Sequence, residues 1–460
     1  MGAKTFAGER VAIIGASIAG LLAARILHES YGEVVLLDRD ALPDSATSRK
    51  ATPHAVHPHG LLAKGREVLE SLFPGFTDSL VAQGALRGDI GMEVAVDANG
   101  ERFAAQPTGI LGLAVSRLAL EAEIRRRVRA LPCVRLLTQV EVLAPAYENG
   151  RVTGLRYQSS NGGHPEVIPA ALVVDCSGRS SHTPTWLGKW GYESPEEERV
   201  QIGLAYTSAY FEREEVRPAL AGVIGAATPS LPRPSILLAQ EPGGDGGQLR
   251  WVAGVGGYEG DHVEDTRESM AKRARDINSP EIAALAENGK MIGRPMQYRM
   301  PYSWRRRYEK LHRFPTGYLA LGDALASFNP IYGQGMTVAT CEAVALREAT
   351  ESGMDGLASR FFKAAAKVID IPWQVSVGAD LALEQVPGPR PFPINLINAY
   401  VGRVQRVAVQ DPRVAAAFIK VMHMIEPPPS LFAPAIAWRV VRGVRSKAVV
   451  APTSLGPIAH

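Results

Sequence analysis

The stretch VAIIGASIAGLLAARIL, residues 11–27, decides the fold of this 460-residue chain. Its first four residues are an apolar, partly β-branched run that is typical of a buried parallel strand. The turn Gly15-Ala-Ser-Ile-Ala-Gly20 follows at once, and apolar residues then recur at helical spacing through about Glu29. A second apolar strand, residues 34–37, ends at Asp38. The sequence therefore predicts a βαβ unit near its start.

This unit has the pattern of a dinucleotide-binding turn. In such a unit the first glycine, here Gly15, makes the tight turn and the last, here Gly20, lets helix and strand pack closely. The N–H groups at the helix start face a pyrophosphate, and the acid after the second strand, here Asp38, takes ribose hydroxyls. Ser17 stands where the motif has its middle glycine. A packing turn without a ligand is the alternative, and the unit alone does not distinguish FAD from NAD.

Composition narrows the class of protein. Hydrophobic residues make up 46% of the chain and charged residues 21%, which is typical of a soluble globular protein with room for about three structural units. A net charge of +3 gives no indication of a nucleic-acid partner. The longest early uncharged run, residues 11–24, is too short to span a membrane. The three cysteines form no CxxC pair and favour a reducing compartment, so we expect a cytoplasmic protein.

A second glycine-rich segment lies far along the chain. It reads Gly317-Tyr-Leu-Ala-Leu-Gly-Asp323-Ala and continues as Phe328-Asn-Pro-Ile-Tyr-Gly-Gln-Gly-Met336. An apolar strand ends at Asp323, whose carboxylate can accept a hydrogen bond from a hydroxyl group. The glycines at 333 and 335 then open a helix whose N–H groups can face an anion or an electron-rich oxygen. A glycine-rich connector without a ligand is the alternative.

A third segment, Ala171-Leu-Val-Val-Asp175-Cys-Ser-Gly178-Arg-Ser-Ser181, is an apolar strand followed by a turn of small residues. Together the three segments resemble the fingerprints of glutathione-reductase-type flavoproteins, in the branch of aromatic hydroxylases, squalene and polyether epoxidases, geranylgeranyl reductases and flavin halogenases. The resemblance covers most of the chain and implies FAD. Asp-Cys-Ser-Gly departs from the hydroxylases' D-G-x-x-S, which weakens the inference of a nicotinamide more than that of a flavin. Halogenases also carry Asp-Cys-Ser-Gly, but their W-x-W-x-I-P segment is not found in this sequence.

The resemblance places two arginines at the cofactor. Arg49 lies where the family has an arginine that meets the FAD diphosphate, and Arg117, after the predicted helix cap Ser116, resembles its flavin-binding arginine. Either arginine is alternatively a solvated surface charge. The arginines at 125, 126, 127 and 129 are predicted to form the exposed face of the same helix. The expected cofactor-binding residues are Gly15, Ser17, Ile18, Ala19, Gly20, Asp38, Arg39, Arg49, His57, Arg117, Asp175, Gly178, Gly322, Asp323, Pro330, Gly333, Gly335 and Met336.

Three histidines occur in the loop Thr52-Pro-His54-Ala-Val-His57-Pro-His59-Gly60. No cysteine or carboxylate within the loop completes a tetrahedral set, so we expect no metal site. The loop resembles the P-Q-x-x-H-x-H stretch of epoxidase-like relatives, which passes beside the isoalloxazine ring. His57 and His59 are then flavin contacts or satisfy backbone groups, and a covalent histidyl link to the flavin stays open.

We expect an α/β fold in which a Rossmann-like FAD-binding domain, with a parallel sheet and an antiparallel meander, carries an inserted, mostly antiparallel substrate domain. The resemblance assigns residues 1–75, 110–194 and 301–345 to the first, 76–109 and 195–300 to the second, and 346–460 to a helical C-terminal region. The hairpin signals Asn149-Gly150 and Asn161-Gly-Gly163 support the meander.

The resemblance implies an FAD-dependent monooxygenase that uses NADPH or NADH and O2. In this class a flavin C4a-hydroperoxide delivers oxygen to a bound apolar small molecule, and the protein supplies a dry pocket. No catalytic residue stands out; Pro330 and Gly333 are candidates for shielding that intermediate. Because no base is evident, and because Gly378-Ala-Asp380 and Gly388-Pro-Arg-Pro resemble epoxidase-like relatives, epoxidation is favoured over hydroxylation. Flavin-dependent reduction of prenyl or other alkene double bonds is the alternative; a non-redox cyclase and a lipid- or protein-binding module are further rivals.

The C-terminal region raises the question of partners. The apolar segment 431–444 contains Trp438, and Arg439, Arg442, Arg445 and Lys447 cluster at its end. A terminal helix docked on the protein is favoured, and peripheral contact with a membrane or with apolar substrate stays open. We expect no transmembrane segment, and the sequence does not distinguish a monomer from a dimer.

Overall fold

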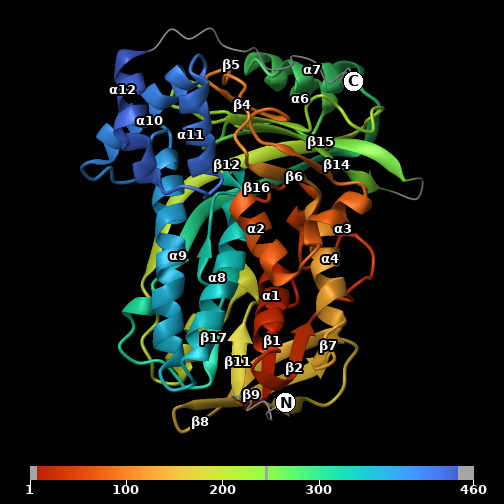
Figure 1. Cartoon of the computed structure of the whole chain (residues 1–460). Coiled ribbons are helices and arrows are strands. Elements are labelled where there is room, and N and C mark those ends of the chain that lie inside the picture. Colours follow the sequence, from red (N-terminus) through yellow and green to blue (C-terminus); the bar gives the residue numbers. More distant parts are fainter. Residues whose placement is uncertain (1–7, 244–246, 444–460) are drawn as a thin grey trace.

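The predicted βαβ unit opens a five-stranded parallel sheet in the computed structural model, which describes residues 8–243 and 247–443 (Figure 1). The unit consists of β1 (Gly8–Ile14), α1 (Ile18–Leu27) and β2 (Tyr31–Asp38). The sheet has the order β17-β11-β1-β2-β7, in which the added strands are β7 (Val134–Thr138), β11 (Leu172–Asp175) and β17 (Tyr318–Ala320). All neighbours are parallel, so the turns that follow β1, β11 and β17 meet at one edge of the sheet.

The alternation of side chains along β1 explains why both faces of this sheet are covered. Val11 and Ile13 are fully buried on the side of α1, α4 (Arg117–Arg129) and α8 (Gln334–Glu351). Ala12 and Ile14 pack on the opposite side against a small antiparallel sheet. Its strands are β8 (Val140–Glu148), β9 (Arg151–Ser159) and β10 (Glu166–Pro169). The predicted meander is thus present, while the strands that flank it, β7 and β11, belong to the parallel sheet.

An eight-stranded sheet lies above the parallel sheet in Figure 1. Its order is β18-β16-β12-β15-β14-β13-β4-β5, and every pair is antiparallel except β13 with β4. The strands are β4 (Val94–Ala98), β5 (Glu101–Arg102), β12 (Glu197–Glu212), β13 (Gly222–Ala226), β14 (Ser235–Gly243), β15 (Gln248–Gly257), β16 (Met291–Arg306) and β18 (Ala326–Ser327). Phe211 and Trp251 bury one face beneath α6 (Arg267–Asp276) and α7 (Pro280–Asn288).

Helices connect and flank the sheets. The long helices α8 and α9 (Leu357–Asp380) run side by side between them (Figure 1). The other elements are α2 (Ala63–Leu72), α3 (Phe76–Ala82), α5 (Thr183–Lys189), α10 (Ile394–Ala408), α11 (Pro412–Met422), α12 (Pro434–Arg442) and the strand pair β3 (Leu86–Asp89) and β6 (Leu111–Ala114). This architecture confirms the predicted fold class; the domain boundaries stay a prediction. In the described part of the chain, no helix combines the length and hydropathy that a membrane span requires.

The prediction for the arginines of α4 is wrong at Arg125. Its side chain is buried, and its guanidinium donates to the carbonyl of Pro43 at 3.0 Å and to Glu121 at 3.2 Å. Arg126, by contrast, keeps 63% of its side chain exposed. The difference arises because α4 packs beneath the loop after β2, which the helix pattern alone does not indicate.

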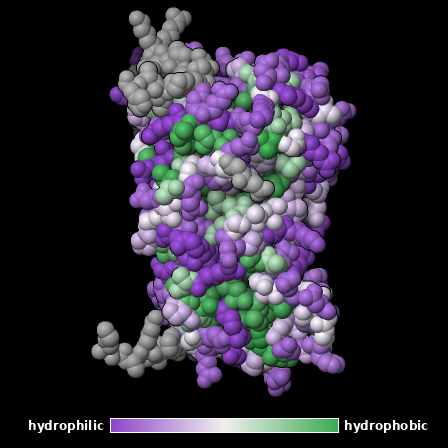
Figure 2. Space-filling model, turned by 90° about the vertical axis from the view of Figure 1, so that its right-hand side faces the viewer, coloured by the Kyte–Doolittle hydropathy of each residue, from purple (hydrophilic) through white to green (hydrophobic). Residues whose placement is uncertain are grey.

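The side of the molecule on the right of Figure 1 has a mixed surface, on which hydrophilic areas separate smaller hydrophobic ones (Figure 2).

Candidate cofactor site

The turn between β1 and α1 is built on two close backbone contacts. Gly15 adopts φ +92°, and a Cβ atom there would lie 2.7 Å from the carbonyl oxygen of Cys176 in the turn after β11. A Cβ atom on Gly20 would lie 1.9 Å from the Gly15 oxygen. Ser17 precedes α1 but does not cap it, and no partner among the described residues accepts from the N–H groups of residues 18–20. The first turn of α1 therefore keeps its amides open for an anionic ligand.

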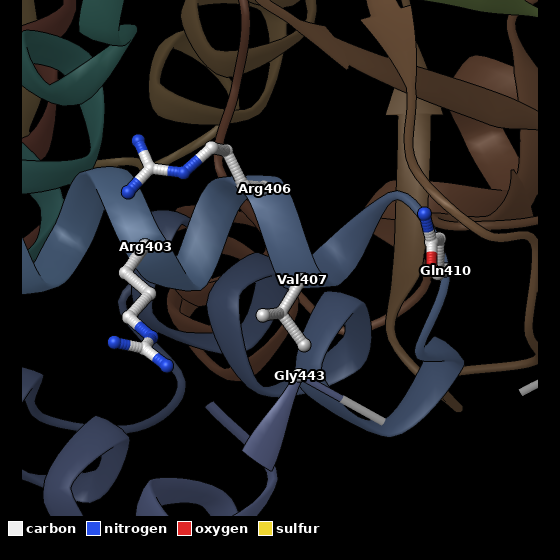
Figure 3. Close-up of a pocket in the computed structure, with 5 residues that line it drawn as sticks. All are labelled: Arg403, Arg406, Val407, Gln410 and Gly443. Atoms are coloured by element: carbon white, nitrogen blue, oxygen red, sulfur yellow. The ribbon is translucent and has the colours of Figure 1, made fainter. Parts of the chain in front are cut away.

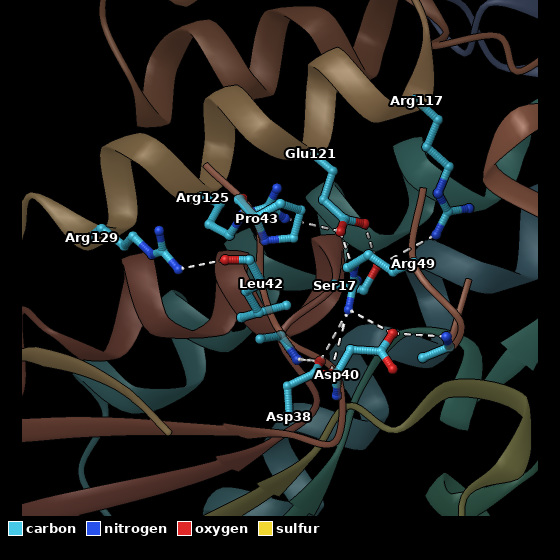
Figure 4. Close-up of polar contacts among 12 residues, drawn as sticks. Ser17, Asp38, Asp40, Leu42, Pro43, Arg49, Arg117, Glu121, Arg125 and Arg129 are labelled. Carbon is cyan, nitrogen blue, oxygen red and sulfur yellow. Dashed lines mark hydrogen bonds and ion pairs between the residues drawn. The ribbon is translucent and has the colours of Figure 1, made fainter. Parts of the chain in front are cut away.

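Asp38, at the end of β2, belongs to a buried ion cluster (Figure 4). Its carboxylate accepts from the N–H groups of Ala16 at 2.8 Å and Asp40 at 2.9 Å, and from Arg49 at 3.4 Å. Arg49 also donates to Glu121 at 2.7 Å. Burial lowers the pKa of Arg49, but the carboxylates of Glu121 and Asp38 outweigh it and hold this pKa above its ordinary value. Arg49 is thus close to the predicted position but already paired with acids.

Arg117 lies at the start of α4 and faces the start of α1 (Figure 4). Ser116 caps α4 as predicted, because its hydroxyl accepts from the N–H of Ala119 at 3.1 Å. One terminal nitrogen of Arg117 approaches the Ser17 hydroxyl at 3.4 Å, while its buried Nε has no hydrogen-bond partner in the described part of the chain. Ser17 itself donates to Glu121 at 2.7 Å. Arg117 therefore has hydrogen-bonding capacity that the protein does not use.

The turn after β11 is fixed by its own acid. Asp175 is fully buried and accepts from the Ser177 N–H at 2.9 Å and from the hydroxyls of Ser177, Ser181 and Thr183 at 2.5, 2.7 and 2.6 Å. These bonds occupy its carboxylate and hold Gly178, at φ +73°, against the turn after β17. Asp175 thus shapes this edge of the site, and its direct contact with a cofactor stays a prediction.

The turn after β17 meets the start of α1 directly. Gly322 adopts φ +74°, and a Cβ atom there would lie 2.7 Å from the Cβ of Ala19. Its N–H donates to the buried Glu342 at 2.7 Å. The next residue, Asp323, is half-buried, and its carboxylate has no hydrogen bond to any described residue. Burial raises the pKa of Asp323, which Arg117 and Arg179 partly offset. An unpartnered acid at this edge fits a ligand that carries hydroxyl groups.

Helix α8 begins as the glycine pattern predicts. Its cap Gly333 adopts φ +64°, and no side chain caps the helix. A Cβ atom on Gly335 would have no protein atom within 4 Å, so this glycine borders open space. The buried Oε1 of Gln334 has no partner within the described residues. Pro330 and Met336 flank this start, Met336 being buried in the core.

The histidine loop lies across the large sheet beside this point. His57 is buried and shares a hydrogen bond of 2.6 Å with the Ser208 hydroxyl, and its ring lies 5.2 Å from Tyr206 and 5.6 Å from Tyr298. Burial lowers the pKa of His57 to about 4 and that of His54 to about 3, so both are uncharged at neutral pH. A Cβ on Gly333 would lie 3.3 Å from the Gly60 oxygen, which shows that the loop ends against the start of α8.

The fold thus brings together most of the residues predicted from sequence. The starts of α1 and α8, Asp38, Arg49, Arg117, Gly178 and Asp323 share one region, whereas Arg39 is exposed and makes no side-chain hydrogen bond to a described residue. Sequence reasoning missed Glu121, although its spacing of four residues from both Arg117 and Arg125 on one helix indicates contact. It also missed Glu342, for which no local signal exists.

Glu342 gives a testable dependence of stability on pH. Burial raises its pKa to about 8 from an ordinary value near 4.5. Because the folded protein then holds a proton that the unfolded chain releases, the free energy of unfolding falls as pH rises from about 4.5 to 8. In this range of pH, the free energy of unfolding should fall by about 1.4 kcal/mol per pH unit because of Glu342, and Glu342→Gln should remove this contribution. Urea denaturation of the cofactor-free protein at several pH values measures it, and equal slopes in both proteins would contradict the assignment.

No family model matches the chain. The Cytophaga hutchinsonii flavoprotein/dehydrogenase has a similar structure, with TM-score 0.64, 16% identity and coverage of 95% of this chain and 99% of that one. The p-nitrophenol 4-monooxygenase PnpA from Pseudomonas putida DLL-E4 gives TM-score 0.61 and 16% identity, with coverage of 92% of this chain and 97% of that one. The Diels-Alderase PyrE3 of pyrroindomycin biosynthesis gives 0.56 and 17%, with coverage of 91% and 81%. These likenesses show the fold of flavin-dependent monooxygenases and their structural relatives.

A curated protein shows closer kinship in sequence. Protein Rv3254 of Mycobacterium tuberculosis (strain ATCC 25618 / H37Rv) is 32% identical over 441 residues, which cover 91% of this chain and 90% of that protein. The chain described here belongs to the same family as Protein Rv3254.

Proposed function

We propose that this chain is an FAD-dependent monooxygenase, with NADPH or NADH as electron donor, that oxidises an apolar small molecule. The observation that carries the proposal is the meeting of two glycine turns from opposite ends of the chain, where Gly322 packs on Ala19. Around this contact lie the open amides of α1, the unpartnered carboxylate of Asp323 and the unpartnered Nε of Arg117. Such a set matches the phosphates and ribitol hydroxyls of FAD.

Each residue has a defined task in this proposal. The first turn of α1 binds the diphosphate through its amides, and Arg117 adds a positive charge beside it. Asp38 accepts from ribose hydroxyls and Asp323 from ribitol. The start of α8, left open by Gly335, holds the ring, and its amides stabilise negative charge that develops there. FAD, when bound, supplies the redox chemistry by accepting electrons from the nicotinamide and activating O2.

The walls beside α8 favour epoxidation over phenol hydroxylation. Phenol hydroxylation requires a base near the substrate oxygen, whereas alkene epoxidation requires none. The polar rings near this point are His57 and His54, whose pKa values of about 4 and 3 make them weak bases at neutral pH. Burial also raises the pKa of Tyr206, which keeps its hydroxyl protonated. The uncharged rings of His54, His57 and Tyr206 suit an apolar alkene and help to exclude water.

The C-terminal helices support a second element of the proposal, a peripheral contact with an anionic membrane. Six of the ten large hydrophobic side chains that are exposed in the described chain lie between residues 391 and 443; they are Phe392, Leu396, Ile397, Phe432, Trp438 and Val441. This region holds six basic and two acidic side chains, and both acids are paired internally, Asp411 with Arg439 and Glu426 with Lys420. Apolar side chains with unneutralised arginines match a bilayer with anionic headgroups.

Helix α12 is docked through Val440, which is fully buried, but it leaves Trp438 54% exposed and Val441 65% exposed. Arg403 and Arg406 project from α10 beside a pocket of 310 Å³ near the end of α12, far in sequence from the predicted cofactor residues, none of which lines it (Figure 3). Val444, the last residue of the predicted apolar segment, lies outside the described residues, as do Arg445 and Lys447 of the predicted basic cluster.

The assay for the reaction combines oxygen consumption with product analysis. We expect the FAD-loaded protein to oxidise NADPH faster in the presence of an apolar alkene than in its absence, and to place one atom of labelled O2 in an epoxide product. Phenols of similar size serve as the matched comparison. Saturated product without label would indicate the reductase instead, and turnover without NADPH consumption would indicate a non-redox reaction.

Sedimentation with lipid vesicles tests the membrane contact. We expect the protein to bind vesicles that contain phosphatidylglycerol and to be released by high salt, because exposed arginines are screened. The double variant Trp438→Ser, Val441→Ser should bind at least about tenfold more weakly, since two apolar side chains no longer enter the interface. Val216→Ser, at a 72% exposed apolar residue elsewhere, is the control. Equal binding of all three proteins, or of neutral vesicles, would contradict the contact.

A further inference from the structure

Asp380, the last residue of α9, is a fully buried acid that the proposed cofactor site does not use. Its Oδ1 atom accepts three hydrogen bonds, from the amide of Asn329 at 2.8 Å, from the hydroxyl of Tyr332 at 2.9 Å and from the hydroxyl of Tyr258 at 3.3 Å. The amide of Asn329 also donates to Tyr258 at 3.1 Å. The other carboxyl oxygen, Oδ2, is buried without a partner in the described part of the chain.

The donors come from two separate parts of the fold. Asn329 and Tyr332 belong to the turn that leads into α8, and Tyr258 directly follows β15 of the large sheet. One carboxyl group therefore ties this turn to the end of α9 and to the sheet. Within the turn, Asn329 also accepts from the N–H of Ile331 at 3.2 Å. The position of Gly333, and hence of the first amides of α8, depends on this network.

No described residue places a positive charge against the carboxyl group of Asp380. The groups that face it are the two tyrosine hydroxyls and the Asn329 amide, and Tyr258 itself packs in an apolar cluster with Leu204, Met300 and Leu381. It also lies at the C-terminal end of a helix, where a negative charge is unfavourable. Burial raises the pKa of Asp380 to about 7, while the three hydrogen bonds lower it in part. Its charge thus changes in the physiological range of pH.

We propose that Asp380 is a positioning residue, which holds the turn 329–333 through Asn329 and Tyr332 and so sets the place of the α8 amides against the flavin ring. The position of the ring rests on the proposed function; the bracing of the turn does not. Loss of the carboxyl oxygen releases both donors of the turn at once. A change in its charge alters the strength of both hydrogen bonds, because a charged acceptor binds more strongly than a neutral one.

The test compares Asp380→Leu, Asp380→Asn, Tyr332→Phe and Tyr258→Phe with the unaltered protein. Tyr332→Phe and Tyr258→Phe each remove one hydroxyl from the same carboxyl group, but only Tyr332 belongs to the turn. Hydrogen exchange of the hydrogen-bonded amides of Ile331, Tyr332 and Gly333 is measured without cofactor, and the absorption spectrum of bound FAD is measured between pH 6 and 8.

We expect Asp380→Leu and Tyr332→Phe to speed exchange of these amides by about tenfold, as the loss of one to two hydrogen bonds implies, and to shift the flavin bands. Tyr258→Phe removes a longer hydrogen bond to Asp380 and the one that Tyr258 accepts from Asn329, so its effect on both signals should be smaller than that of Tyr332→Phe. Asp380→Asn keeps an acceptor oxygen, so it should retain slow exchange and the flavin bands of the unaltered protein, but these bands should no longer change with pH near 7.

Several results would overturn the inference. Unchanged exchange in Tyr332→Phe, an effect of Tyr258→Phe as large as that of Tyr332→Phe, or a pH dependence of the flavin bands that persists in Asp380→Asn would each show that Asp380 does not position the turn. If Asp380→Leu does not fold, the two tyrosine variants still decide. An unaltered protein that takes up no FAD would remove the proposed function, whereas the exchange measurements would still test the bracing of the turn.

Discussion

The close approach of three strand-end turns is the constraint on which the rest of this structure depends. Gly15 lies against the backbone of Cys176, Gly20 against Gly15, and Gly322 against Ala19. A Cβ atom added to any of these three glycines would lie less than 3 Å from the neighbouring residue. Glycine at these positions lets β1, β11 and β17 end side by side. Because the strands are parallel, segments that are far apart in sequence contribute to a single edge. Without these contacts the open amides of α1 would not face Asp323.

Electrostatics divides this edge into two parts. Around Asp38, the charges of Arg49, Glu121 and Arg125 neutralise one another within the protein. Around Arg117 and Asp323, polar groups are left with unused hydrogen-bonding capacity. Unpaired buried polar groups cost free energy, so the Nε of Arg117 and the Oε1 of Gln334, which have no partner among the described residues, support the proposal that a ligand binds here. The paired cluster then acts as a fixed support for the unpaired part.

The features that were predictable from sequence are those with local causes. The βαβ unit follows from apolar periodicity, the cap at Ser116 from its side chain, and the start of α8 from the glycines at 333 and 335. Arg125 could not be placed correctly, because the loop that covers it joins α4 only in the folded protein. Asp380 bonds to Tyr258, which lies 122 positions earlier in the sequence, and to Asn329, which lies 51 positions earlier. No periodic pattern connects these residues.

Titration with FAD tests most directly the proposal that the start of α8 and the turns of β1 and β17 bind this cofactor. Gly335→Ala and Gly378→Ala both add a methyl group where no protein atom lies within 4 Å, and in a helix alanine is favoured over glycine by up to about 1 kcal/mol, so neither should destabilise the cofactor-free protein. We predict that the unaltered protein and Gly378→Ala each bind one FAD. Gly335→Ala should bind FAD at least about tenfold more weakly, because its methyl group enters the space for the flavin ring. An unaltered protein that takes up no FAD, or a Gly335→Ala variant that binds as well as the control, would contradict it.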